Sequence, residues 1–264
     1  MLQIKGLKKT FGRGSINEKL ALDTLDLSLN DGEFATIIGG NGAGKSTLLN
    51  CISGVFEIDQ GRIMLDDMDL SFCPEHKRSR YIGRVFQDPM KGTAFDMTIE
   101  ENLAIAYDKA KPRGLRPGIR KSDIKLFRDR VSLLDLGLED RMQQKVGLLS
   151  GGQRQALTLL MATMVKPRLL LLDEHTAALD PSIAKKVMDL TRQIVSDHQL
   201  CTLMVTHNMK AALAFGTRTI MMHEGRIMLD LQGKEREDMT IERLIEQFGK
   251  KSGTELDNDR LLLG

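Results

Sequence analysis

The sequence predicts an α/β fold in which a mainly parallel sheet is covered by helices. Short apolar runs typical of buried strands occur at residues 34–39, 168–173 and 201–206. They alternate with stretches that have a helical pattern, at 45–54 and 182–197. Such alternation is typical of parallel strands joined by helical crossovers, which bury both faces of the sheet.

The pattern changes between residues 89 and 165, where strand-like runs stop and helix-forming residues predominate. We interpret 89–165 as a helical lobe inserted into a core made of residues 1–88 and 166–264. A basic segment broken by Gly and Pro, 109–123, interrupts the lobe. It is interpreted as a solvated loop, with contact to anionic lipid or to a partner as the alternative. The chain ends in a polar tail, 251–264.

The composition argues against a nucleic-acid-binding protein, a secreted protein and a membrane-spanning protein. The 264 residues include 38 basic and 36 acidic ones, with 4% aromatic residues, which argues against a nucleic-acid partner. Three cysteines without metal or disulfide spacing favour a reducing compartment. The sequence contains no secretory signal and no apolar stretch long enough to span a membrane. We therefore expect a soluble, cytosolic protein, for which any contact with a membrane must come through a partner.

The run GGNGAGKST directly follows the apolar strand that ends at Ile38. It satisfies the pattern G-x-x-x-x-G-K-[ST], in which glycines turn backbone N–H groups toward phosphate and the next helix adds its positive end. Lys45 is expected to reach the β- and γ-phosphates of a nucleotide, and Ser46 to ligate Mg²⁺. This motif alone does not distinguish a kinase, a GTPase or a motor. The alternative is a glycine-rich turn with an incidental lysine. The predicted nucleotide-binding residues are Gly39, Gly40, Asn41, Gly42, Ala43, Gly44, Lys45, Ser46 and Thr47.

Two adjacent acids, Asp173 and Glu174, end the apolar run at 169–172. Side chains alternate between the two faces of a strand, so both acids cannot point at one ion while the strand stays regular. Asp173 is predicted to join the Mg²⁺ shell, and Glu174 to polarise the water that attacks the γ-phosphate. The alternative is a pair of acids that solvate the end of a buried strand.

A run LSGGQ, residues 149–153, stands at the start of another predicted helix. The order of the phosphate loop, LSGGQ and LLLLDE resembles that of the ATP-binding-cassette (ABC) ATPases, over residues 1–250. The resemblance implies a P-loop NTPase core with an N-terminal antiparallel β lobe and the inserted helical lobe. A serine and glycines at the start of a helix can also bind an anion, because they offer backbone N–H groups and a hydroxyl to it. The resemblance implies a head-to-tail dimer. In this dimer, the LSGGQ segment of one subunit would cover the ATP bound to the phosphate loop of the other, through Ser150, Gly151, Gly152 and Gln153.

Four further positions match motifs of this family. By resemblance, Gln87 ligates the metal, senses the γ-phosphate and hinges the lobe, and His207 holds the γ-phosphate and the attacking water. Asp180, in the segment 178–180, would cross the dimer and couple the two sites. Phe11 is placed to stack on adenine. The alternatives are a structural histidine at 207 and a core phenylalanine at 11.

Two residues depart from the pattern of the family. Gly40 stands where the family often has Pro or Ser, which should loosen the phosphate loop without removing a phosphate ligand. His175 stands where these proteins usually carry Pro. Its imidazole either tunes the neighbouring Glu174 or points away and fills a turn.

The resemblance implies an ATPase subunit of a membrane transporter, with ATP and Mg²⁺ as cofactors. Its partners would be a second cassette, as a homodimer or a paired subunit, and separately encoded transmembrane permease subunits. The run DEHTAALDP is similar to cassettes of bacterial importers of amino acids or related small solutes, which implies an extracytoplasmic solute-binding protein as well.

The alternative is a soluble ABC ATPase that drives assembly or signalling, of the iron–sulfur delivery or cell-division type. Cassettes that act on DNA or ribosomes usually have coiled-coil inserts or two cassettes in one chain, and neither is visible in this sequence. A small-molecule P-loop kinase is disfavoured by LSGGQ.

Overall fold

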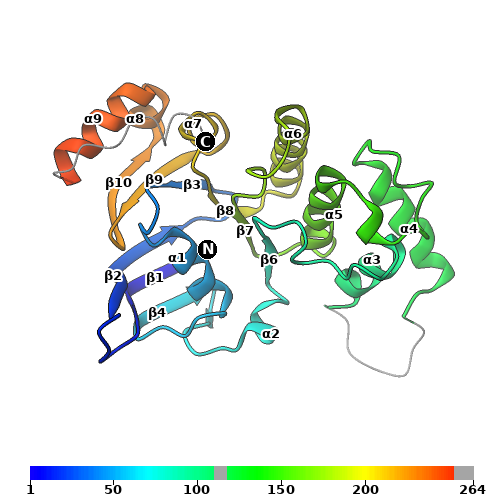
Figure 1. Ribbon diagram of the computed structural model, residues 1–264, viewed down its shortest axis with the longest axis horizontal. Helices are drawn as coiled ribbons and strands as arrows, with labels where there is room; N and C mark the ends of the chain where they lie inside the picture. The colour runs from blue at the N-terminus through cyan, green and yellow to red at the C-terminus, as the bar shows by residue number, and fades with distance from the viewer. Residues whose placement is uncertain (110–117, 253–264) are drawn as a thin grey trace. The chain divides into compact units, whose positions relative to one another are not determined.

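The computed structural model describes residues 1–109 and 118–252, and Figure 1 shows their helices and strands. The chain forms two compact units. The first takes Met1–Arg78 together with the chain from Gln199 onward, and the second takes Ser79–His198. The predicted polar tail lies almost entirely outside the described residues, as does the middle of the basic segment. No helix in the described ranges is both long and apolar enough to cross a membrane.

The first unit begins with an antiparallel sheet in the order β2-β1-β4-β5. Along β2, buried Leu25 and Leu27 alternate with exposed Asp26 and Ser28, which is the pattern of a strand with one face on the core. This sheet confirms the predicted N-terminal antiparallel β lobe. Its strands are β1 (Leu2–Phe11), β2 (Lys19–Leu29), β4 (Gln60–Leu65) and β5 (Met68–Asp69).

The same unit contains strands in the order β10-β9-β3-β8. β3 pairs in parallel with both β8 and β9, while β10 runs antiparallel to β9. Every residue of β3 and β8 is buried, as expected of central parallel strands. The strands are β3 (Phe34–Ile38), β8 (Cys201–Val205), β9 (Arg218–His223) and β10 (Arg226–Gln232).

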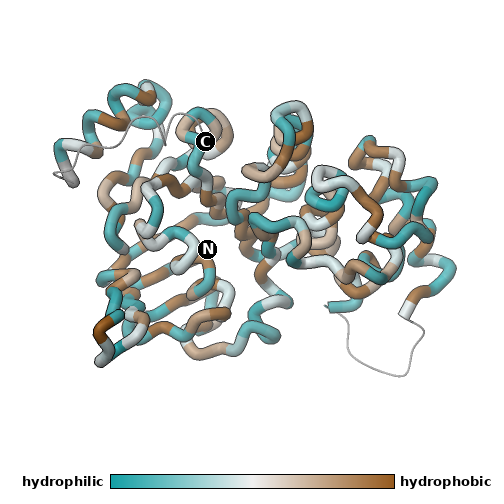
Figure 2. The backbone as a smooth tube through the Cα atoms, in the orientation of Figure 1, coloured by the Kyte–Doolittle hydropathy of each residue, from teal (hydrophilic) through white to brown (hydrophobic). Residues whose placement is uncertain are grey.

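Some helices of the first unit pack on these strands through apolar faces. Leu244 and Phe248 of α9 lie four residues apart, on one face of the helix, and join a buried cluster with Ile38 and Met221. Figure 2 shows α9 as a mostly hydrophilic helix with hydrophobic residues at intervals. The helices are α1 (Lys45–Ser53), α2 (Glu75–Arg78), α7 (Met209–Phe215), α8 (Gly233–Glu237) and α9 (Ile241–Ser252).

The second unit pairs β6 (Ile82–Val85) in parallel with β7 (Leu169–Asp173) and adds a helical core. Apolar side chains from its helices form that core, among them Leu103, Phe127 and Leu157. The predicted helical lobe lies within this unit. Its helices are α3 (Ile99–Asp108), α4 (Lys121–Ser132), a 3-10 turn (Val146–Leu148), α5 (Gly151–Thr163) and α6 (Pro181–His198).

Candidate functional site

The phosphate loop, residues 39–47, follows β3 in the first unit and includes the first residues of α1. Two of its glycines cannot be replaced without a clash. Gly39 has a φ of 152°, and a Cβ there would lie 2.3 Å from the carbonyl oxygen of Met222. Gly44 has a φ of 98°, and its Cβ would lie 2.6 Å from the carbonyl oxygen of Ala21. Both obstacles are backbone atoms, so the loop conformation depends on glycine at these two positions.

Lys45 is the first residue of α1, and its ammonium folds back over the loop. The side chain is 5% exposed, and Nζ donates hydrogen bonds to the carbonyl oxygens of Gly39 (2.7 Å) and Gly40 (3.0 Å). The N-cap residue Gly44 has no side chain with which to cap the first amides of the helix. A buried cation beside a helix N-terminus is the environment that a phosphate group requires. The residues of this loop therefore fit the phosphates of a nucleotide.

A second lysine reaches the loop, and no sequence motif predicts it. The Nζ atom of Lys19, at the start of β2, lies 3.6 Å from the position that a Cβ on Gly42 would occupy. Lys19 is exposed and follows a long loop, so nothing in its sequence neighbourhood marks it as a binding residue. Only the packing of β2 beside the loop brings its charge there.

Phe11 ends β1 and is partly exposed rather than part of the core. Its ring packs edge-to-face with Phe56, with ring centroids 5.1 Å apart and an interplanar angle of 79°. The Nζ of Lys9 lies 5.4 Å from the centroid of the Phe11 ring. An aromatic ring that is held by neighbours and still reaches solvent suits stacking on a base.

His207 lies between β8 and α7, and the residues on either side of it are held by hydrogen bonds. The Asn208 amide donates to Thr206 Oγ1 (3.1 Å), and Asn208 Oδ1 accepts from the amide of Ala211 (2.9 Å), which caps α7. These bonds determine the path of the backbone through His207, whose side chain is half-buried.

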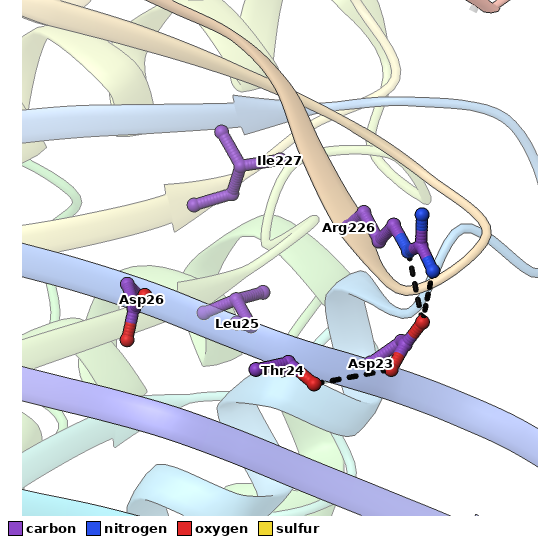
Figure 3. Close-up of a pocket in the computed structure, with 6 residues that line it drawn as sticks. All are labelled: Asp23, Thr24, Leu25, Asp26, Arg226 and Ile227. Atoms are coloured by element: carbon purple, nitrogen blue, oxygen red, sulfur yellow. Dashed lines mark hydrogen bonds and ion pairs between the residues drawn. The ribbon is translucent and has the colours of Figure 1, made fainter.

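A hollow with a volume of about 410 Å³ lies between β2 and β10. Figure 3 shows the side chains that line it. None of its lining residues was predicted to bind nucleotide. Arg226 Nε donates to Asp23 Oδ2 (2.8 Å), and this bond lowers the pKa of the Asp23 carboxyl. The Asp23 amide also donates to the carbonyl oxygen of Gly225. Gly225 packs against the phosphate loop, because a Cβ on Gly44 would lie 3.3 Å from the Cα of Gly225. The pair thus supports a turn that packs against the phosphate loop.

In the second unit, the two adjacent acids occupy different environments. Asp173 ends β7 and is 9% exposed, and its Oδ2 lies 3.7 Å from Nη2 of Arg84 on β6. Glu174 lies beyond the strand end, is half-buried, and has a φ of 43° in the left-handed region. The expectation that the strand does not continue through both acids is therefore correct, while their separate roles stay predictions.

His175 is buried, with 2% of its surface exposed, and its side chain contacts α6. Its Nε2 lies 3.1 Å from Thr191 Oγ1, and Thr191 Oγ1 lies 2.7 Å from the carbonyl oxygen of Val187. Burial lowers the pKa of the His175 imidazole to about 4. The imidazole is therefore neutral at physiological pH.

The LSGGQ run begins α5, as predicted, and forms a capping box. Ser150 Oγ accepts from the amide of Gln153 (3.3 Å), while Gln153 Oε1 accepts from the amide of Ser150 (3.1 Å). The Ser150 hydroxyl keeps its own proton for donation to another acceptor, such as a phosphate oxygen. Gly151 is exposed at the first helical position.

Gly152 lets α5 approach α6 closely. A Cβ on Gly152 would lie 2.1 Å from Cγ2 of Ile183, whereas one on Gly151 would lie at an ordinary 3.6 Å from Leu179. The exposed Asp180 precedes α6, and its carbonyl oxygen accepts from the amide of Ala184 (2.8 Å).

Gln87 lies just after β6, and its side chain is exposed. The preceding residue is tied to the helical part of the unit, because Gln155 Nε2 of α5 donates to the carbonyl oxygen of Phe86 (3.1 Å). The second unit therefore holds Gln87, the two acids, the LSGGQ run and Asp180. The first unit holds the phosphate loop, Phe11 and His207.

Comparison with known proteins identifies the family. A family model described as ABC transporter matches residues 22–177. The chain belongs to this family. The cassette is 45% identical over 248 residues to the tyrosine transport ATP-binding protein of Clostridioides difficile (strain R20291), which covers 94% of this chain and 98% of that protein.

A second relative of the cassette is the spermidine/putrescine import ATP-binding protein PotA of Escherichia coli (strain K12). It is 36% identical over 232 residues, which cover 87% of this chain. The chain spans only 56% of the length of that relative.

Solved structures confirm the predicted fold of the cassette. The dimeric ATP-binding cassette MJ0796, in a post-hydrolysis state with ADP and Pi, superimposes with a TM-score of 0.76 at 27% identity, covering 88% of this chain and 98% of that one. A nucleotide-free cassette of an ABC transporter gives a TM-score of 0.74 at 26% identity, covering 89% and 92% of the two chains. The resemblance inferred from the three motifs is therefore correct.

Proposed function

We propose that this cassette binds and hydrolyses ATP to drive import of an amino acid or a related small solute through separate membrane subunits. The observation that carries the proposal is the 45% identity to a tyrosine transport ATP-binding protein along 98% of that relative. Other relatives have names that refer to import of spermidine and putrescine or of sulfate and thiosulfate. An amino acid is favoured because the tyrosine protein is both more similar and matched over 98% of its length.

In this proposal the phosphate loop holds ATP. Its backbone amides and the Lys45 ammonium bind the β- and γ-phosphates, and Phe11 stacks on adenine. The buried position of Lys45 against the carbonyl oxygens of Gly39 and Gly40 supports this role. An arriving phosphate would offer the ammonium a stronger, charged acceptor in place of these carbonyls.

Hydrolysis needs a metal and a base. Ser46, Gln87 and Asp173 are the proposed ligands of Mg²⁺, which would neutralise charge on the phosphate oxygens when bound. Glu174 accepts a proton from water as the water oxygen attacks the γ-phosphorus and the bond to the β-phosphate oxygen breaks. His207 holds the γ-phosphate and orients this water. The half-buried Glu174, placed just past a buried strand, supports its assignment as the base.

The proposed partners follow from the family. A second cassette would contribute Ser150, Gly151, Gly152 and Gln153 to each ATP, with Asp180 at the dimer contact, and the dimeric MJ0796 structure supports such a pair. Permease subunits would hold the dimer at the cytoplasmic face of the membrane, and an extracytoplasmic binding protein would deliver the solute. No nucleic acid is involved in this proposal.

Reconstitution tests the proposal. The cassette would be purified with the membrane proteins that copurify with it, placed in vesicles with their binding protein, and supplied with ATP. We expect ATP-dependent uptake of labelled tyrosine, and none with a Lys45→Ala cassette. If the vesicles take up putrescine or sulfate but not tyrosine, the solute is a polyamine or sulfate rather than an amino acid. ATP hydrolysis without any copurifying membrane protein would instead favour the soluble assembly or signalling ATPase.

A further inference from the structure

We propose that His175 is a positioning residue, which holds the backbone of Glu174 in place through a hydrogen bond from its Nε2–H to Thr191 on α6. The inference rests on the proposed function, because it concerns the base for ATP hydrolysis. It assigns a task to the residue that departs from the family pattern, at the position just after the base.

The backbone at Glu174 requires support. Its φ of 43° is one that non-glycine residues rarely adopt, and such a conformation persists only where the surrounding structure maintains it. One contact comes from the turn itself, in which the amide of Ala177 donates to the carbonyl oxygen of Glu174 (3.0 Å). The next residue, His175, provides an anchor outside the turn because its side chain is buried against α6.

The direction of the hydrogen bond follows from the hydroxyl of Thr191. Thr191 Oγ1 has a single proton, which it donates to the carbonyl oxygen of Val187 at 2.7 Å. Oγ1 can therefore only accept from Nε2 of His175, which lies 3.1 Å away. This arrangement assigns the Nε2–H tautomer to His175.

The bond connects the base to a long and rigid element. Thr191 is completely buried near the middle of α6, a helix of 18 residues. The proline that usually follows the base in this family constrains its own φ and has no side-chain donor. In this chain a buried hydrogen bond provides the constraint instead. Loss of the bond would release the turn that carries Glu174 while leaving the phosphate loop unchanged.

Substitutions at Thr191 separate this role from simple packing. Thr191→Val keeps the shape of the side chain but removes the acceptor, whereas Thr191→Ser keeps the hydroxyl. We expect Thr191→Val to lower kcat for ATP hydrolysis about tenfold with KM for ATP unchanged, since displacement of a reacting group slows chemistry more than binding. Thr191→Ser should retain most of kcat. Equal kcat values for the two variants would overturn the proposal.

The matched control is Thr158→Val on α5. Thr158 is 2% exposed, and its Oγ1 donates to the carbonyl oxygen of Arg154, four residues earlier, at 2.9 Å. This substitution removes the same kind of hydroxyl from the same kind of helical site, but no histidine depends on it. A tenfold loss of kcat in Thr158→Val as well would show that helix packing explains the effect, and would overturn the positioning role.

Variants at His175 give a second test that does not depend on folding of Thr191→Val. The side-chain amide nitrogen of Gln lies about as far from the backbone as Nε2 of His, whereas that of Asn lies closer to the backbone. We therefore expect His175→Gln to retain more of kcat than His175→Asn, and equal values would contradict the tether. A ¹⁵N spectrum of the imidazole groups should show the Nε2–H tautomer for His175, and the other tautomer would overturn the assignment.

The outcomes also distinguish this inference from the proposed function. Wild-type protein that hydrolyses ATP while Thr191→Val keeps its full kcat rejects the role of His175 alone. Wild-type protein that binds ATP but never hydrolyses it, with or without its membrane partners, rejects the proposed function and this role with it.

Discussion

The ammonium of Lys45 donates a hydrogen bond of 2.7 Å to the carbonyl oxygen of Gly39, at the other end of the phosphate loop. The bond closes the loop on itself and keeps a positive charge buried at the end of β3. A buried ammonium is costly unless it is hydrogen-bonded, and a phosphate can replace the carbonyl with a charged acceptor. We therefore expect this contact to link the conformation of the loop to its affinity for nucleotide.

Lys45→Ala should weaken ATP binding at least about tenfold, because a hydrogen bond between two charged groups contributes more than a neutral one. Titration with a fluorescent ATP analogue measures the Kd. The melting temperature should change little, which would show that the variant is folded. Unchanged affinity would mean that the loop is not the phosphate site.

Lys19→Gln should raise the Kd for ATP about twofold to fivefold, the effect expected of one exposed charge. The loss should shrink as salt is added, since exposed charges are screened. Lys5→Gln is a matched control, because Lys5 is also exposed, on the neighbouring strand β1. If both variants weaken ATP binding equally, Lys19 makes no specific contribution to ATP binding at the phosphate loop.

Glu174→Gln should bind ATP normally while hydrolysing it at least about a hundredfold more slowly, because the amide cannot accept the proton from water. ATP that is bound but not hydrolysed should also hold two cassettes together. Phosphate release and light scattering measure the two effects. A variant that turns over ATP at the wild-type rate would remove Glu174 from its role as the base.

Gly152→Ala should destabilise the protein by about 1–3 kcal/mol, because its methyl group would overlap Ile183 and push α5 from α6. Gly151→Ala, one residue earlier, is the matched control: its Cβ would meet Leu179 at an ordinary 3.6 Å. Thermal melting of the two variants compares the effects. Equal melting temperatures would argue against the close approach of the helices at Gly152.

Acid should destabilise the fold through His175. Burial lowers the pKa of its imidazole to about 4, so between about pH 6.5 and this value the unfolded chain binds a proton that the folded chain does not. The unfolding free energy should therefore fall as pH falls. From about pH 7.5 to about pH 5, wild-type protein should lose about 2 kcal/mol more than His175→Gln. Chemical denaturation at the two pH values measures this difference, and identical losses would contradict the burial of a neutral imidazole.

Features coded by neighbouring residues could be predicted from the sequence. The phosphate loop, the start of α5 at Gly151 and the end of β7 at Asp173 each depend on a few adjacent residues, since caps, turns and buried strands have local patterns. The order of these motifs along the chain is sufficient to indicate the family. The limits of the inserted lobe and the roles of the individual site residues stay predictions.

Contacts between distant residues were decided only by the tertiary structure. The approach of Lys19 to Gly42, the close packing of Gly152 on Ile183, and the hydrogen bond between His175 and Thr191 all join different elements. Each depends on how strands and helices pack, to within an ångström, and no local pattern records that distance. The sequence by itself determined that the chain carries the phosphate loop and motifs of an ABC cassette. The tertiary structure decided which neighbours support those motifs, because support comes from side chains that meet only after folding.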